Sequence, residues 1–421
     1  MYPPRCAILT RSITSPRRAT GRKAPVTFQI LATCVQTAAR AGVLTTPHGA
    51  IHTPAFMPVG TQATVKHLDP HELRAAGAEC LLANTYHLAL RPGAEAIRRL
   101  GGLHRFMGWD GPLLTDSGGF QVWSLAPLRE VTPAGVRFRS HLDGQPWFFT
   151  PEGVIALQQA LGADIIMPLD VCLDYPASYA EAAAAVATTQ AWAVRSVAAL
   201  SGSRQALFGI VQGGTYPELR RQAARALVTL DLPGYAIGGL SVGEPKATTF
   251  AILAATVAEL PVDRPRYLMG VGAPDDLLRA VACGVDLFDC TLPARLGRRG
   301  SLLTRHGRIN LRNARFRSEA GPPVPDCSCT VCTHYPAATL HWLFQEGHAL
   351  AGRLATYHNV HFLCQLLREA HAAIRAGWFP AFQAAFLASW VPGDPALSDQ
   401  QRARWRAAQQ RRAALRTSPL L

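Results

Sequence analysis

The segment DLFDCTLP, residues 286–293, is a short apolar run that ends in a polar turn. Most of the runs of this kind are separated by alanine- and leucine-rich segments with helical spacing, such as PELRRQAARALVTL (217–230). Strands that alternate with helices indicate βα units and a parallel sheet. Eight units over about 240 residues predict an α/β fold, a (β/α)8 TIM barrel with a small appended subdomain; an open doubly wound sheet is the alternative. The seven earlier runs are AFMPVG (55–60), CLLANTY (80–86), PLLTDSGG (112–119), DIIMPLD (164–170), ALFGIVQGG (206–214), YAIGGLSVG (235–243) and RYLMGVG (266–272).

Five of the eight runs carry a polar residue or a glycine at the C-terminal end. In a barrel these ends converge on one rim, where active sites lie. An aspartate taken singly could equally be a helix N-cap or an ion-pair partner. The shared position on separate strands favours a functional site instead. The five residues are Asp116, Asp170, Gln212, Gly239 and Asp289.

The charge of the chain is unevenly distributed. Of the net charge of +14, residues 1–26 carry +6 and residues 390–421 carry +4, which leaves only +4 for the long central part. Between Cys290 and Ser318 there are eight arginines and no acidic residue. Such a basic stripe on a nearly neutral body predicts a polyanionic partner at one face; a solvated surface with its acids elsewhere is the alternative.

A cysteine cluster follows the basic stripe. Cys327, Cys329 and Cys332 have the spacing C-x-C-x₂-C. Three thiolates and one imidazole form a closed tetrahedral zinc set, which predicts one structural Zn²⁺; three free cysteines are the alternative. The ten cysteines, without a secretory signal, indicate a reducing compartment. The spacing alone leaves open which downstream histidine completes the set: His334, His341, His348, His358 or His361.

These features predict four parts of the chain. Residues 1–26 form a basic, disordered extension, for which an organellar transit peptide or a misassigned start codon is also open. Residues 27–318 form the barrel, residues 319–389 a zinc-binding helical subdomain packed on it, and residues 390–421 a basic tail. No apolar stretch reaches the roughly 18 residues of a membrane span, so no membrane partner is expected.

Several long blocks, from about Phe28 to about Phe386, resemble the tRNA-guanine transglycosylases. They include TPAFMPVGTQATVK (53–66), LTDSGGFQV (114–122), YAIGGLSVGEPK (235–246), DLFDC (286–290) and CSCTVC (327–332). The resemblance implies that Asp289 is the nucleophile, Asp116 the general acid and base, and His358 the fourth zinc ligand beside the three cysteines. It also implies a base-binding set: Asp170, Gln212, Gly239 and Leu240 at the edge of the base, with Phe120 and Met269 on the faces of its ring.

The resemblance also implies a substrate and partners. The enzyme would exchange guanine at the wobble position of a tRNA with a U-G-U anticodon-loop sequence. Arg295, Arg298 and Arg299 would hold the RNA beside the nucleophile. Cys172 and Val242 take the form found in bacterial members, whose small pocket accepts 7-aminomethyl-7-deazaguanine rather than queuine. A cytoplasmic homodimer is expected.

Some positions depart from the family pattern. Val171, Ser241, Ala294 and Arg299 replace its usual residues beside the base pocket and the RNA-binding helix, and Thr339 replaces an aromatic residue of the dimer interface. Two other functions are alternatives. A non-catalytic tRNA-binding partner subunit need not retain both aspartates, and a glycoside hydrolase on the same barrel would leave the arginine stripe and the cysteine cluster without a role.

Overall fold

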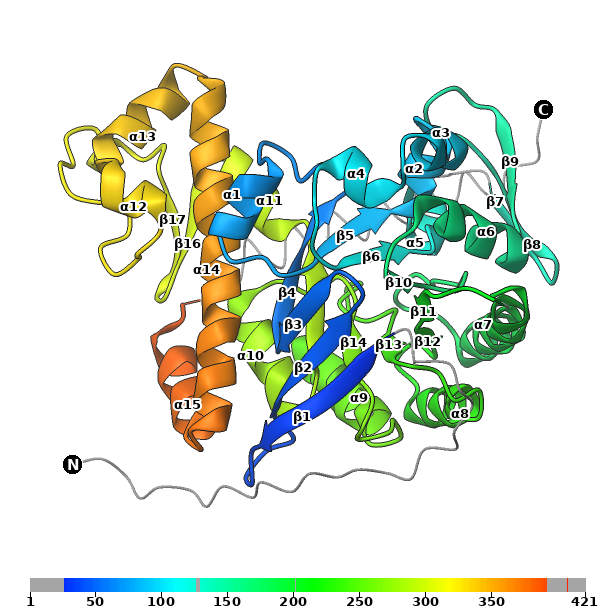
Figure 1. Cartoon of the computed structure of the whole chain (residues 1–421). Helices are drawn as coiled ribbons and strands as arrows, with labels where there is room; N and C mark the ends of the chain where they lie inside the picture. The colour runs from blue at the N-terminus through cyan, green and yellow to red at the C-terminus, as the bar shows by residue number, and fades with distance from the viewer. Residues whose placement is uncertain (1–25, 126–128, 201, 392–406, 408–421) are drawn as a thin grey trace.

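A barrel of eight parallel strands forms the centre of the molecule (Figure 1). The computed structural model describes residues 26–125, 129–200, 202–391 and 407. The fifth strand is interrupted at Phe208 into β11 and β12, which pair with β10 and β13, and the pairing of β15 with β4 closes the ring. All eight predicted runs therefore contain barrel strands, and the TIM barrel is confirmed. The strands are β4 (Ala55–Gly60), β5 (Leu81–Asn84), β6 (Leu113–Asp116), β10 (Ile165–Ile166), β11 (Ala206–Leu207), β12 (Gly209–Val211), β13 (Tyr235–Ile237), β14 (Arg266–Leu268) and β15 (Leu287–Cys290).

Helices follow the strands and cover the outside of the barrel. Local capping explains several of their bounds: Ser178 and Glu181 form a capping box at the start of α7, and Gly162, with φ of +81°, ends α6 in a left-handed turn. The helices are α1 (Pro70–Ala75), α2 (Thr85–Leu90), α3 (Ala94–Arg99), α4 (Leu103–Met107), α5 (Gly119–Leu125), α6 (Pro151–Leu161), α7 (Tyr179–Ala199), α8 (Pro217–Val228), α9 (Lys246–Val257), α10 (Pro274–Ala282) and α11 (Leu292–Arg298).

The core has two layers. Side chains inside the barrel include Met57, Leu114, Phe208 and Tyr267, all of them buried. A second layer of leucine, valine and alanine lies between the strands and the surrounding helices. Strands that are buried on both faces read as nearly continuous apolar runs, which is why the sequence showed them clearly.

Two antiparallel sheets are added to the barrel, and neither was predicted. The first consists of β1 (Thr27–Thr33), β2 (Arg40–Thr46) and β3 (Gly49–Thr53). The second consists of β7 (Arg129–Thr132), β8 (Gly135–Arg139) and β9 (Pro146–Phe149), inserted between α5 and α6. Both sheets have exposed faces and therefore lack the continuous apolar pattern of the barrel strands.

The C-terminal part is arranged along one long helix, α14 (Ala349–Arg375). The hairpin of β16 (Ser301–Thr304) and β17 (Gly307–Asn310) and the helices α12 (Thr330–His334) and α13 (Ala337–Gln345) lie at one end of α14, and α15 (Phe379–Ser389) lies at the other (Figure 1). A 3-10 turn, η1, spans Ala314–Phe316. The boundary placed between residues 318 and 319 stays a prediction.

The predicted terminal extensions lie almost wholly outside the described residues. Within the described part of the chain, no helix combines the length and the apolarity needed to cross a bilayer.

Candidate active site and metal centre

Asp289 lies on the last barrel strand, β15, where two donors hold one of its carboxylate oxygens. The hydroxyl of Tyr267 donates to Asp289 Oδ1 at 2.6 Å, and the N–H of Gly270 donates to the same oxygen at 2.7 Å. Burial raises the pKa of Asp289, and these two hydrogen bonds oppose the rise because they stabilise the ionised form. Within the described residues no donor contacts Oδ2, so this oxygen is free to react.

Asp116 is the last residue of β6 and is 9% exposed. Its Oδ2 accepts a hydrogen bond of 2.5 Å from the side-chain amide of Asn84, and its Oδ1 accepts one of 3.0 Å from the N–H of Thr85. Burial, with a smaller contribution from the charge of Asp289, raises the pKa of Asp116 to about 7. At neutral pH this carboxyl can therefore either donate or accept a proton.

A polar group of four side chains lies beyond the C-terminal ends of β6, β10 and β12. Gln212 follows β12 directly, and its Nε2 donates to Asp170 Oδ2 at 2.8 Å. The thiol of Cys172 lies 3.6 Å from the same oxygen, and the hydroxyl of Ser117 donates to Asp170 Oδ1 at 3.2 Å. Burial raises the pKa of Asp170, and these hydrogen bonds oppose the rise. The cluster presents a carboxylate and an amide side by side, which suits the donors and acceptors of a purine edge.

The turn after β13 approaches Gln212 so closely that only glycine fits. Gly239 has φ of +65°, and a Cβ built there would lie 2.4 Å from Gln212 Oε1. The guanidinium of Arg220, which is fully buried, donates to the carbonyls of Gly238 and Gly239 at 2.7 and 3.2 Å. Leu240, also buried, follows in the same turn. Arg220 therefore fixes the backbone that the resemblance assigns to base recognition.

A buried glutamate fixes the next residues of this turn. Glu244 accepts hydrogen bonds from the N–H groups of Ser241 and Val242 at 2.5 and 2.9 Å. Ser241 has φ of +59°, a conformation that a residue with a side chain adopts rarely. The carboxylate thus holds a strained turn beside the polar cluster.

The two residues expected on the faces of the base also follow barrel strands. Phe120 lies in α5, four residues after Asp116, and is 46% exposed. Met269 follows β14 directly and packs, half-buried, against the barrel interior. An exposed phenylalanine beside a buried polar cluster is suited to stacking on a planar ligand.

The three arginines lie on or directly after α11, which begins two residues after β15 ends. Arg295 and Arg299 are exposed and Arg298 is half-buried. Burial and the neighbouring Arg295 and Arg299 lower the pKa of Arg298. Within the described residues, no carboxylate lies at ion-pair distance from any of the three. These cations are therefore available for an anionic partner next to Asp289.

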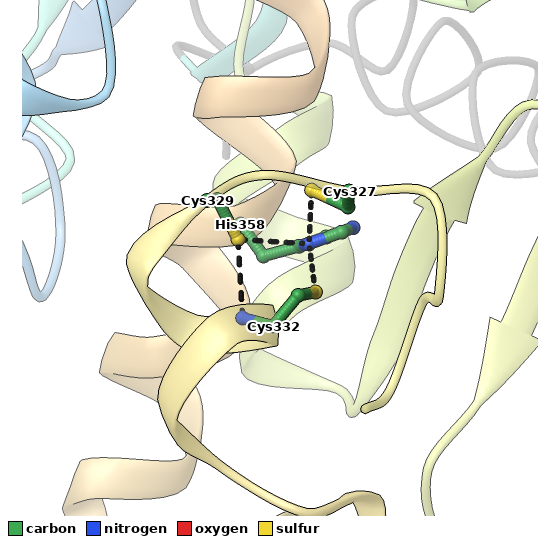
Figure 2. A group of neighbouring side chains, drawn as sticks. All are labelled: Cys327, Cys329, Cys332 and His358. Atoms are coloured by element: carbon green, nitrogen blue, oxygen red, sulfur yellow. Dashed lines mark hydrogen bonds between the residues drawn. The ribbon is translucent and has the colours of Figure 1, made fainter. Parts of the chain in front are cut away.

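The three predicted cysteines and His358 form one cluster (Figure 2). The sulfurs of Cys327, Cys329 and Cys332 lie 3.6, 3.4 and 3.3 Å from Nδ1 of His358. The other ring nitrogen, Nε2, lies 2.8 Å from the carbonyl oxygen of Leu303 and must donate to it, so in the neutral ring, the form that binds a metal, Nδ1 carries a lone pair directed at the sulfurs. A tetrahedral zinc site separates sulfur and nitrogen by about 3.5 Å. The cluster can hold a metal ion, and its donors fit zinc.

Sequence reasoning missed the residues that orient the carboxyls. Tyr267 and Asn84 both lie inside predicted runs, but a tyrosine within a strand or an asparagine at the end of one carries no signal of its hydrogen-bond partner. Arg220 was read only as part of a helical segment. Glu244 lies in the block YAIGGLSVGEPK, but nothing in the sequence indicates that its carboxylate binds the turn before it.

The chain is similar in sequence to known proteins over most of its length. Residues 34–392 match a family described as queuine tRNA-ribosyltransferase. A protein of that name from Desulforudis audaxviator is 53% identical over 365 residues, which cover 86% of this chain and 98% of the relative. Another from Dehalococcoides mccartyi is 51% identical over 378 residues, 90% of this chain and 96% of the relative. A third, from Pelotomaculum thermopropionicum, is 53% identical over 86% of this chain and 98% of the relative.

Proposed function

Because the chain belongs to the queuine tRNA-ribosyltransferase family, we propose that it is a tRNA-guanine transglycosylase of queuosine biosynthesis. It exchanges guanine at the wobble position of tRNA for 7-aminomethyl-7-deazaguanine. The observation that carries the proposal is the contrast between two carboxyls on one rim. Asp116 has a pKa of about 7, whereas Asp289 is held by two donors that favour its ionised form. Two carboxyls in different environments, one able to exchange a proton near neutral pH and one held by donors that favour the carboxylate, suit the two roles of a double displacement.

In the first displacement, Asp289 attacks the ribose. Its free Oδ2 forms a bond to C1′ of the guanosine while the C1′–N9 bond breaks. Asp116, in its protonated form, gives its proton to the leaving guanine. The products are a covalent ribosyl–aspartate ester, free guanine and an ionised Asp116.

In the second displacement, the incoming base reverses these steps. N9 of the 7-deazaguanine attacks C1′, the ester bond to Asp289 breaks, and Asp116 accepts the N9 proton. Two inversions at C1′ leave the configuration of the ribose unchanged. The hydrogen bonds from Tyr267 and Gly270 stabilise Asp289 both as the attacking and as the departing carboxylate.

The base is recognised by the cluster at β10, β12 and β13. The ring N–H and exocyclic amine of a guanine-like base donate to Asp170, and its carbonyl oxygen accepts from Gln212 and from backbone N–H groups of the Gly239–Leu240 turn. Phe120 and Met269 contact the two faces of the ring. Half-buried Cys172 and Val242 limit the space at the 7-substituent, which favours aminomethyl over the bulkier group of queuine.

The tRNA is held by α11. The target nucleotide leaves its stack to enter the pocket, and bases of an RNA loop are recognised best when they are splayed out in this way. Arg295, Arg298 and Arg299 then contact the neighbouring nucleotides and phosphates of a U-G-U anticodon loop. Their lack of acidic partners in the described chain supports this role.

The remaining parts of the proposal concern zinc, assembly and location. The metal in the Cys327–His358 cluster is one Zn²⁺, which crosslinks α12 and α14 and takes no part in the reaction. Trp342, 48% exposed on α13, and the nearby Tyr335 support a homodimer. A tRNA-modifying enzyme with free thiols acts in the cytoplasm.

The test is exchange of radiolabelled guanine into a tRNA that carries the U-G-U sequence, with the aminomethyl base and queuine as competitors. We expect incorporation, suppressed mainly by 7-aminomethyl-7-deazaguanine. Suppression mainly by queuine would refute the assignment from Cys172 and Val242. Bound tRNA without any incorporation would identify a non-catalytic partner subunit.

A further inference from the structure

A second group of potential metal ligands lies at the end of the barrel opposite the catalytic rim. His48 is in the turn between β2 and β3, His104 is in α4, and Asp164 directly precedes β10. Nitrogen atoms of both imidazoles and a carboxylate oxygen lie within 4.8 Å of one another. Because Asp164 stands at the N-terminal end of its strand, this group is separate from the rim that carries Asp116 and Asp289.

The aspartate is held in place before any ion arrives. Its side chain is 1% exposed, and its Oδ2 accepts a hydrogen bond of 2.9 Å from the N–H of Leu113. Its Oδ1 lies 2.6 Å from Nδ1 of His48. Metal-binding carboxylates are commonly fixed by such a second hydrogen bond, which orients the remaining lone pairs.

His104 has a nitrogen that the described protein does not satisfy. Its Nε2 is buried and lies 3.4 Å from Asp164 Oδ2, but no described residue forms a hydrogen bond with it. Donor atoms of a tetrahedral site with nitrogen and oxygen ligands are about 3.3 Å apart. The separation of His104 and Asp164 is therefore compatible with coordination of a shared ion.

We propose that His48, His104 and Asp164 bind a divalent transition-metal cation. Imidazole nitrogens select zinc, cobalt, nickel or copper over magnesium and calcium, and three protein ligands leave at least one position for water. The ion would join the β2–β3 turn and α4 to the start of β10. Conserved structural features at this end of a TIM barrel contribute to stability rather than to catalysis, and the ion would do the same.

Binding requires one local rearrangement. The rings of His48 and His104 are stacked, with centroids 3.6 Å apart and planes inclined by 21°, so one ion cannot lie in both planes as they stand. The side chain of His48 is 41% exposed and belongs to a turn, so it can rotate at little cost. Its contact with Asp164 would lengthen from 2.6 Å as the ion replaces the proton between them.

Solvent reaches this group through a cavity of about 410 Å³. His48, Gly49 and Pro112 line it together with two carboxylates, Glu79 and Asp110, and two guanidinium groups, Arg74 and Arg368, so the charges of its lining are balanced. A hydrated ion can therefore reach His48, the exposed ligand of the three.

The experiment is a cobalt titration of the full-length protein with zinc already bound at the cysteine cluster. Calorimetry and visible absorption measure the binding of Co²⁺. We expect one Co²⁺ per chain in addition to the zinc, with a spectrum that lacks thiolate-to-cobalt charge-transfer bands. If Co²⁺ instead replaced the zinc at the cysteines, the charge-transfer bands would appear and would reveal the exchange.

Three variants locate the binding. His48→Ala and His104→Gln should weaken the additional Co²⁺ by at least about tenfold, whereas the exposed His71→Ala should bind it as the wild type does. Co²⁺ should also raise the melting temperature of the wild type but not of His48→Ala. The proposal is overturned if no additional Co²⁺ binds, if all three variants bind it equally, or if Mg²⁺ displaces it at similar concentration. In those cases the group is only a hydrogen-bonded contact.

Discussion

Replacing Asp116 by asparagine tests whether the carboxyl of Asp116 is protonated in the folded protein near neutral pH. The pKa of Asp116 is raised from an ordinary value of 3.8 to about 7, chiefly by burial. A folded state that binds a proton more tightly than the unfolded state loses stability as the pH rises through this interval. The free energy of unfolding of the wild type therefore falls progressively between these two pKa values. Above about pH 7, ionising the buried carboxyl has lowered it by the full amount, about 4 kcal/mol.

The asparagine side chain does not ionise, so it avoids this cost. Between about pH 5 and about pH 8 the cost to the wild type grows by about 2–3 kcal/mol, and the variant should gain that much stability relative to the wild type. For a chain of this length the gain corresponds to a shift of about 3 °C in melting temperature. The NH₂ group of the new side chain cannot accept a hydrogen bond, so either Asn84 or Thr85 loses its acceptor. The loss of stability from this missing hydrogen bond is the same at every pH.

The assay is thermal or denaturant unfolding of both proteins across this pH range, with the difference plotted against pH. Asp110→Asn, which changes an aspartate that is 89% exposed, is the matched control and should show no comparable trend. A difference between Asp116→Asn and wild type that stays constant with pH would refute the reasoning. Asp116 would then be ionised at neutral pH and could not be the acid that protonates guanine.

Three further predictions concern the nucleophile, the RNA and the base. Asp289→Asn should abolish the covalent RNA adduct on a denaturing gel while tRNA still binds; an adduct of normal yield would exclude Asp289 as the nucleophile. Arg298→Gln should weaken tRNA binding and reduce the slope of log K against log salt by about 0.7–0.9, and an unchanged slope would argue against a phosphate contact. Gly239→Ala should raise KM for the base with little effect on tRNA affinity, because the added Cβ would displace Gln212; Gly347→Ala, which has a matching φ of +66° and whose Cβ meets nothing within 4 Å, is the control.

The barrel was predictable because its strands are buried on both faces. A strand such as DLFDC has apolar side chains on both faces and ends at a polar rim. This pattern can be recognised in the amino-acid sequence alone. The sheets β1–β3 and β7–β9 are short, partly exposed and antiparallel, so their residues resemble loop segments. The interruption of the fifth strand at Phe208 has no sequence signal at all, since ALFGIV reads as one continuous run.

The residues of the candidate site also fall into two groups, those that the sequence indicates and those that it does not. Residues that stand at strand ends, such as Asp116 and Gln212, could be placed on one rim by counting strands. The resemblance assigned their roles, and for the fourth metal ligand it selected His358 among five histidines, which spacing could not do. Residues that act through a neighbour were missed, because the hydrogen bonds of Tyr267 and Arg220 span about 20 residues and depend on how the strands are aligned.

The metal cluster and α11, the helix that carries Arg295 and Arg298, are connected through α14. A Cβ at Gly297 would lie 2.5 Å from the backbone nitrogen of Thr356, so α11 and α14 are in close contact at this point. On the same turn of α14, His358 points to the cysteines. Asn359 donates to the carbonyls of Pro293 and Ser301 and accepts from the N–H of Leu303. Asn359 thus fixes both ends of the segment that carries the arginines. A metal ion at His358 would hold this turn of α14 in register, so a structural ion that never meets the substrate can still determine where Arg298 stands relative to Asp289.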